Sequence, residues 1–182
     1  MASELVHGAL AFATSAHRGQ DRRYTAEPYI VHPLEVWRLV RDAGGTDVMQ
    51  AAALLHDVVE DTDATLDDVA RECGTAVAEL VEWLTDVAVP ADGNRAARAA
   101  IDRERLAAAP AEAQTIKLAD LIDNAESVAR HDPRFARVYM EEKRALLDVL
   151  SRGDARLMRI ARARLAGWDA GERSGTEGGR DG

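Results

Sequence analysis

The residues best suited to chemistry lie within residues 51–62, which read Ala-Ala-Ala-Leu-Leu-His-Asp-Val-Val-Glu-Asp-Thr. The first half is apolar and predicts a backbone in the core, where a charged group must be paired or bound to a metal. On a helix, His56 and Glu60 share a face at i,i+4, and so do Asp57 and Asp61. A neutral imidazole beside a carboxylate is a common start to a divalent-metal site. The alternative is a helix end with a capped histidine and solvated acids.

A second apolar helical stretch, residues 116–124, also carries polar residues on one face. Lys117, Asp120 and Asn124 recur there at i, i+3 and i+7. An acid in such surroundings needs a partner, so Asp120 is a candidate metal ligand. Lys117 and Asn124 would then support the metal or contact a substrate. The alternative is a buried ion pair between Lys117 and Asp120.

Another histidine, His32, precedes a proline, which is favoured at the first position of a helix. Its imidazole can therefore point into a site at the start of a helix, although taken alone it is more typical of a capping or packed histidine. His131 and Asp132 repeat the His-Asp pair, but Pro133 follows and predicts a turn rather than a site.

Arg22 and Arg23 lie in a polar loop predicted over residues 20–29. The planar guanidinium suits phosphate oxygens, so the pair is a candidate phosphate or base contact. The alternative is a pair of solvated surface charges. The arginines of residues 95–108 could line a phosphate entrance or form an exposed basic face.

Helical spacing of apolar residues runs through most of the chain, whereas strand-type alternation is hard to find. The fold class expected is all-α, with one compact domain over residues 1–166. The helices are predicted near residues 5–16, 33–43, 46–62, 65–73, 75–84, 95–108, 116–128, 134–152 and 157–165. Residues 167–182 lack an apolar pattern and are predicted to be a disordered tail.

Length and charge narrow the class of protein. A chain of 182 residues favours one domain, and its net charge of -9 makes nucleic-acid binding through a basic surface a poor default. The single cysteine, Cys73, excludes an internal disulfide framework. The sequence shows neither a membrane span nor a secretion signal, so we expect a cytoplasmic protein with no membrane partner. The oligomeric state is not determined by the sequence.

Four segments, taken together and in order, resemble a known family. They are Ala16–Gln20, Pro28–Leu34, Ala52–Thr62, and Ile116–Asp120 with Asn124. They are similar to the HD-domain hydrolases of the RelA/SpoT type, and most closely to the small stand-alone alarmone hydrolases of the Mesh1 kind. The likeness covers residues 5–150.

The resemblance implies an all-α HD-domain fold, a bound Mn²⁺ ion, and removal of the 3′-pyrophosphate from guanosine tetra- or pentaphosphate. Other divalent metals are alternatives, because histidine with carboxylate also suits iron or zinc. By motif position, the metal ligands are His32, His56, Asp57 and Asp120. Catalysis falls to Glu60 and Asp61. Substrate contact falls to Arg22, Arg23 and Asn124, to which the helix spacing adds Lys117.

Two positions depart from the family pattern. Leu121 and Asp123 stand where the family usually has Arg or Lys and then His or Tyr, and the loop after Arg23 lacks the usual glycine. Another nucleotide substrate, such as an adenosine alarmone or the 2′-phosphate of an NADPH-type cofactor, is therefore an alternative. A third hypothesis is a nucleotide sensor without turnover, against which Glu60 and Asp61 argue.

Overall fold

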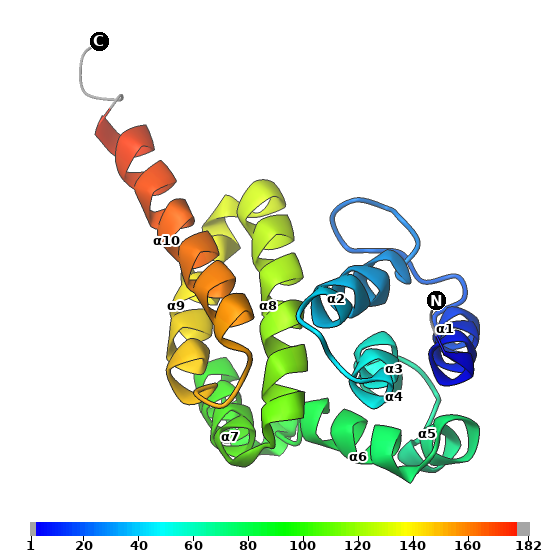
Figure 1. The fold of residues 1–182 in the computed structure, drawn as a ribbon. Helices are drawn as coiled ribbons and strands as arrows, with labels where there is room; N and C mark the ends of the chain where they lie inside the picture. The colour runs from blue at the N-terminus through cyan, green and yellow to red at the C-terminus, as the bar shows by residue number, and fades with distance from the viewer. Residues whose placement is uncertain (1–2, 178–182) are drawn as a thin grey trace.

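The chain folds into helices joined by loops, of which the one between the first two helices is long, as seen in a computed structural model that describes residues 3–177 (Figure 1). Within these residues no strand forms, and an isolated antiparallel bridge joins Asp21 and Pro28. This confirms the predicted all-α class. The helices in chain order are α1 (Glu4–Ala16), α2 (Val31–Asp42), α3 (Asp47–Leu55), α4 (Val58–Asp61), α5 (Leu66–Cys73), α6 (Thr75–Leu84), the short 3₁₀ helix η1 (Pro90–Asp92), α7 (Arg95–Ala108), α8 (Ala111–His131), α9 (Pro133–Val149) and α10 (Ala155–Glu177).

Several helices begin and end at the residues that the sequence predicts. The Thr46 side chain caps α3 by accepting a hydrogen bond from the Met49 amide. Thr65 and Asp68 form a capping box at the start of α5, in which the side chain of each residue accepts a hydrogen bond from the backbone amide of the other. Gly74 lies between α5 and α6 with φ of 91°, a left-handed conformation that costs glycine little.

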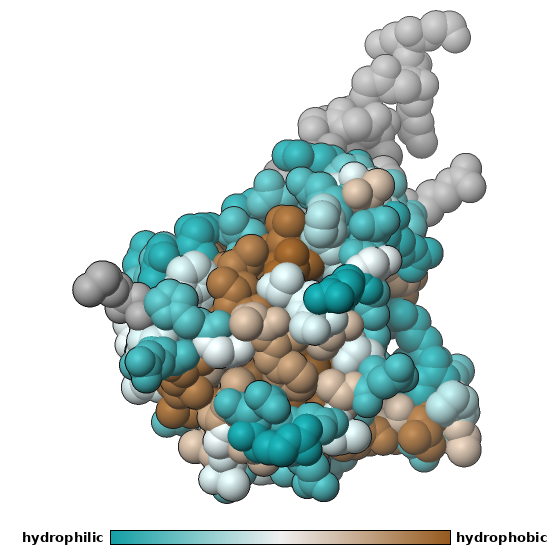
Figure 2. Space-filling model, turned by 90° about the vertical axis from the view of Figure 1, so that its right-hand side faces the viewer, coloured by the Kyte–Doolittle hydropathy of each residue, from teal (hydrophilic) through white to brown (hydrophobic). Residues whose placement is uncertain are grey.

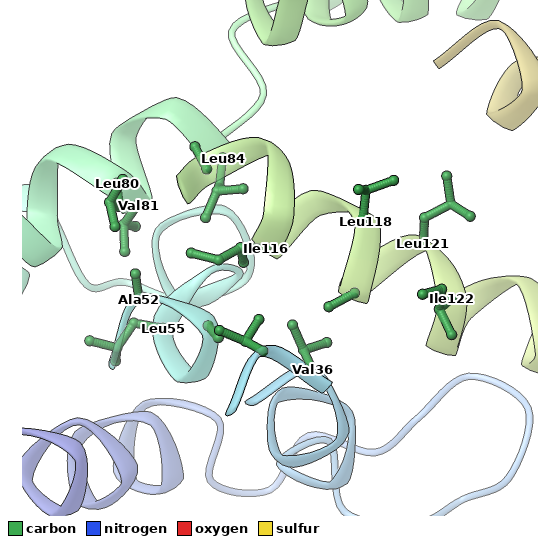
Figure 3. Packing of buried hydrophobic residues seen from close by; sticks show 14 of the residues in the cluster. Val36, Ala52, Leu55, Leu80, Val81, Leu84, Ile116, Leu118, Leu121 and Ile122 are labelled. Carbon is green, nitrogen blue, oxygen red and sulfur yellow. The ribbon is translucent and has the colours of Figure 1, made fainter. Parts of the chain in front are cut away.

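Helix α8 lies at the centre of the fold, with α2, α3 and α6 on one side and α9 and α10 on the other (Figure 1). Figure 3 shows Ile116 pointing toward α3 and α6, whereas Leu118 and Leu121 point to the opposite side. All three side chains are buried. Burying each of them contributes about 1.5–3 kcal/mol, so α8 joins the two sides of the core and holds a fixed position.

The turn before α10 packs closely on α8. A Cβ atom on Gly153 would lie 2.6 Å from Leu118 Cδ1 and 3.2 Å from the Gln114 backbone. The buried Gln114 side chain accepts a hydrogen bond from the Arg152 amide and donates one to the Leu106 carbonyl. The turn therefore requires a residue without a side chain at position 153.

The central stretch differs from the sequence prediction. Residues 51–62 are not one continuous helix, because α3 ends at Leu55 and α4 begins at Val58. Adjacent side chains on a continuous helix point about 100° apart. His56 and Asp57 keep backbone dihedrals in the right-handed helical region, so the interruption is slight, and both side chains reach the same point.

The C-terminal segment also differs from the prediction. Helix α10 continues through residues 167–177, part of the segment predicted to be disordered. Extending an existing helix requires no new nucleation, so a weakly patterned sequence can continue it. Residues 178–182 of the predicted tail lie outside the described residues, and the domain boundary at residue 166 stays a prediction.

The surface mixes apolar and hydrophilic residues. On the face shown in Figure 2, an apolar area in the centre is bordered by hydrophilic residues. Much of the surface of any folded protein is apolar, so this area alone does not indicate a partner. None of the helices in the described part of the chain combines the length and apolar composition that a membrane crossing requires.

Candidate metal centre and active site

Side chains from separate parts of the chain converge on one point. His32 comes from α2, and His56 and Asp57 come from the junction of α3 and α4. Their ligand atoms all lie within 4.8 Å of one another, and the two histidine Nε2 atoms are 3.2 Å apart. Asp57 Oδ2 is 3.4 Å from His32 Nε2 and 3.2 Å from His56 Nε2. These three groups could hold a metal ion.

Asp120 on α8 borders the same point. Its Oδ1 atom lies 3.4 Å from His32 Nε2 and 3.9 Å from His56 Nε2, and the residue is buried. Two imidazoles and two carboxylates therefore face one another from distant segments. This set of nitrogen and oxygen donors suits a divalent transition metal.

The outer nitrogens of both rings have fixed partners. His56 Nδ1 is 2.8 Å from the Ala53 carbonyl oxygen, and His32 Nδ1 is 2.7 Å from Asp123 Oδ2. A carbonyl or an ionised carboxylate only accepts, so each Nδ1 carries the hydrogen. When each imidazole is neutral, its Nε2 lone pair is then directed toward the shared point, as metal ligation requires.

The site holds its two central carboxylates in the ionised form. Burial alone would raise the pKa of Asp57, but the positive charge of a protonated His56 and the hydrogen bonds from His32 and His56 outweigh it and hold that pKa well below its ordinary value. Burial also opposes ionisation of Asp120, yet the Lys117 ammonium and the imidazoles keep its pKa far below the usual range. Both groups are therefore negative at neutral pH and attract a cation.

Lys117 and Asn124 both hold Asp120. Lys117 Nζ is 3.0 Å from Asp120 Oδ2, and Asn124 Nδ2 donates a hydrogen bond to Asp120 Oδ1 at 2.6 Å. The ion pair named above as an alternative is thus present. It leaves Asp120 Oδ1 facing the histidines, so pairing with Lys117 and proximity to the metal point are compatible.

Glu60 and Asp61 lie beside this cluster in different surroundings. The Tyr29 hydroxyl is 2.6 Å from Asp57 Oδ2 and 2.8 Å from Asp61 Oδ2, so it joins the two acids. Glu60 accepts a hydrogen bond from the Asp86 amide. Although Glu60 keeps contact with solvent, the protein packed around it and the Asp86 charge raise its pKa to about 7. Glu60 can therefore exchange a proton near neutral pH.

Arg22 and Arg23 border a hollow of about 210 Å³ next to His32. Asn124 and Tyr29 line the same hollow. Arg22 Nη2 donates a hydrogen bond to Asp123 Oδ2 at 2.7 Å, and the Arg23 guanidinium lies over the Tyr24 ring at 5.4 Å. Both arginines line this hollow, where Arg22 is partly buried and Arg23 is exposed.

A second hollow, of about 280 Å³, opens between α7 and α9. Its cationic lining residues are Arg95, Arg98, Arg103, Lys117 and Lys143. Acids also line it, and Glu142 pairs with Arg95 at 2.7 Å. Lys117 belongs both to this hollow and to the Asp120 ion pair, so the basic lining reaches the metal point.

Sequence reasoning missed two residues of the site. Tyr29 lies in a quoted motif but was given no role, and Asp123 was noted only as a departure from a pattern. The available signal for Asp123 was its spacing, since it lies one helical turn from Asp120. The His131–Asp132 pair is not among the groups that converge on the metal point: Asp132 caps α9, as expected of a turn residue, and both residues contact Tyr24 at the edge of the arginine hollow.

Comparison with known proteins adds the family. A family model described as "HD domain" matches residues 9–150. The chain belongs to the HD-domain family. Among curated relatives of this HD-domain chain, the human guanosine-3′,5′-bis(diphosphate) 3′-pyrophosphohydrolase MESH1 is 42% identical over 127 residues, which span 67% of this chain and 68% of the human protein.

Other matches point to the same family. A probable guanosine-3′,5′-bis(diphosphate) 3′-pyrophosphohydrolase of Synechocystis is 47% identical over 81 residues, or 44% of this chain. The HD-domain chain spans 10% of that protein and 19% of a related Aquifex aeolicus enzyme. Among solved structures, a metazoan ortholog of SpoT described as hydrolysing ppGpp matches with a TM-score of 0.81 and 28% identity, covering 90% of this chain and 95% of that one.

Proposed function

We propose that this chain is a metal-dependent pyrophosphohydrolase that removes the 3′-pyrophosphate from guanosine tetra- or pentaphosphate. The observation that carries the proposal is the convergence of His32, His56, Asp57 and Asp120 beside Glu60. The names of the human and Synechocystis relatives support it. With guanosine tetraphosphate, the products would be GDP and pyrophosphate.

We propose Mn²⁺ as the ion, held by His32, His56, Asp57 and Asp120. When bound, a divalent ion lowers the pKa of a coordinated water and stabilises negative charge on a phosphate. The protein supplies two anionic and two neutral donors, and the Nδ1 contacts keep both imidazoles correctly oriented. Iron and zinc fit the same donors, so metal substitution belongs in any assay.

Glu60 is the proposed general base. A pKa of about 7 leaves its carboxylate able to accept a proton from the attacking water at neutral pH. Hydrolysis breaks the bond between the ribose 3′ oxygen and phosphorus, and the departing 3′ oxygen takes up a proton. Asp61, hydrogen-bonded to Tyr29, would orient the water.

The basic groups on the two sides would bind the polyphosphate. We assign Arg22, Arg23 and Asn124 to one side of the substrate and Lys117 to the other. The overall charge of -9 opposes the approach of a polyanion, so these local cations are needed. The arginines of the α7–α9 hollow extend the positive lining away from Lys117.

A different nucleotide is the second candidate, and one contact favours it. Arg22 is bound to Asp123, a residue that departs from the family pattern, so the surroundings of Arg22 differ from those that the resemblance implies. An adenosine alarmone would release pyrophosphate, whereas an NADPH-type 2′-phosphate would release phosphate. A substrate panel that measures both products separates these candidates.

The decisive test is pyrophosphate release from guanosine tetraphosphate with Mn²⁺ and then with a chelator. We expect turnover with Mn²⁺ and its loss on chelation. Tight binding of the nucleotide without release of pyrophosphate would instead support a sensor. Release of phosphate from the 2′-phosphorylated cofactor, with none from the alarmone, would assign the other substrate class.

A further inference from the structure

We propose that Asp123 is a positioning residue that fixes His32 as a metal ligand and ties Arg22 to the metal centre. This inference rests on the proposed metal-dependent function. The family resemblance gives Asp123 no role. The inference gives a physical meaning to Asp123, one of the departures from the family pattern.

One oxygen of Asp123 serves both partners. Asp123 Oδ2 lies 2.7 Å from His32 Nδ1 and 2.7 Å from Arg22 Nη2. The side chain of His32 is 3% exposed and that of Asp123 is 17% exposed, so water competes little for these contacts. Because a carboxylate only accepts, the hydrogen of a neutral His32 stays on Nδ1. Its Nε2 lone pair then faces His56 and Asp57.

One turn of helix α8 therefore carries two carboxylates with different roles at the metal point. Asp120 faces the metal point directly, and Asp123, three residues later, acts on it through His32. A carboxylate hydrogen-bonded to the outer nitrogen of a ligating histidine orients the ring and strengthens it as a donor. The same rigid helix thus sets the positions of two of the four proposed ligands.

The contact between Asp123 and Arg22 connects the proposed metal site to the hollow proposed to bind the substrate. Arg22 lies in the loop before α2 and also lines the hollow of about 210 Å³ with Arg23. A guanidinium has five N–H donors, so Arg22 can hold Asp123 and still offer donors to a phosphate. Loss of Asp123 would therefore weaken metal binding and loosen the placement of Arg22 together.

The test is a titration of the purified chain with Mn²⁺ alone, in which the free ion is followed by electron paramagnetic resonance. Asp123→Leu removes the acceptor, and we expect it to weaken Mn²⁺ binding by about 10- to 100-fold. Asp123→Asn keeps an oxygen that accepts from Nδ1, so we expect a smaller loss. This partial rescue would not follow from a merely structural role.

Glu126→Gln is the matched control. Glu126 lies on the same helix as Asp123, pairs with Arg164 and Arg130, and has no hydrogen bond or ion pair with the histidines. We expect wild-type Mn²⁺ affinity in this variant. Affinity of Asp123→Leu within twofold of wild type, with its helical circular dichroism intact, would overturn the proposal. So would a wild-type chain that binds no Mn²⁺.

A second measurement needs no change at position 123. In the zinc-loaded wild-type protein, nitrogen-15 spectra of the imidazoles should show a slowly exchanging Nδ1–H on His32, assigned by its loss in His32→Gln. A hydrogen on Nε2 would overturn the proposal. Neither measurement uses a nucleotide, so a chain that binds Mn²⁺ but releases no pyrophosphate would fail the proposed function and leave the role of Asp123 intact.

Discussion

Three carboxylates that lie close together in this site differ in how tightly they hold a proton. Asp57 and Asp120 are kept ionised by imidazoles and by Lys117, whereas the pKa of Glu60 is raised to about 7. The first two are suited to holding a cation, and the third is suited to moving a proton. Such divergence between neighbouring acids is how an active site assigns separate roles to the same functional group.

Glu60→Gln tests that division. The amide cannot accept the proton, so kcat should fall by about 10²- to 10⁴-fold. Mn²⁺ affinity and the thermal unfolding midpoint should stay near those of the wild type, because Glu60 is not a proposed ligand. Steady-state kinetics with a parallel Mn²⁺ titration would check this. Wild-type turnover in the variant would remove Glu60 from the mechanism.

The dependence of activity on pH follows from the same group. A general base acts only when deprotonated, so activity should rise as the pH increases through about 7 and level off above it. The residual activity of Glu60→Gln should lack this rise. The measurement is kcat/KM from pH 5 to 9 at saturating Mn²⁺. Equal pH profiles for the wild type and the variant would assign the rise to another group.

Residue types and spacing made His56, Asp57 and Asp120 candidate ligands, and the family resemblance grouped them with His32 as a set. They could not show the contacts of Asp123 with His32 and with Arg22. His32 lies 91 residues before Asp123 in the chain, and Arg22 lies 101 residues before it. Such contacts depend on how α2 and the preceding loop lie against α8. A single sequence carries no signal of that placement.

Helix boundaries were predicted well wherever a local rule decides them. Thr46, Thr65 and Gly74 act as caps or stops through contacts within a few residues. The interruption at His56 and Asp57 was missed, because apolar spacing continues smoothly across it. The side chains at the interruption make long-range contacts: the Tyr29 hydroxyl, 28 residues away, binds Asp57, and both side chains face the partners from α2 and α8.

The turn between α9 and α10 provides a test of packing at the level of elements. Gly153→Ala would bring a Cβ to 2.6 Å from Leu118 Cδ1, so we expect a loss of about 1–3 kcal/mol in the free energy of unfolding. Urea denaturation with the linear extrapolation measures it.

Gly167→Ala is the matched control, because an added Cβ there meets nothing within 4 Å. Since alanine favours a helix over glycine by about 1 kcal/mol, this variant should be neutral or slightly more stable. Equal stability of both variants would mean that the turn has room for a side chain, contrary to the packing described here.

For the molecule as a whole, the proposed ion would join segments that are far apart in the chain. The ligands come from α2, from the α3–α4 junction and from α8, whose Asp120 lies 88 residues beyond His32. In the unfolded chain these groups do not share a site. Metal binding should therefore stabilise the fold as a unit rather than one helix.

A thermal or chemical unfolding series with and without Mn²⁺ checks that expectation. At a free concentration of 100 times Kd, binding to the folded state alone should add about 2.7 kcal/mol to the free energy of unfolding. His56→Gln should lose most of this gain, and Glu126→Gln should keep it. A gain of equal size in all three chains would indicate weak binding elsewhere on the acidic surface.

The most direct test is an anomalous difference map from crystals grown with Mn²⁺ and measured at the manganese absorption edge. We expect one strong peak within coordination distance of His32 Nε2, His56 Nε2 and the carboxylates of Asp57 and Asp120. A strong peak at another place, or a fully loaded chain in which these four side chains do not contact the ion, would show that these residues do not form the metal site.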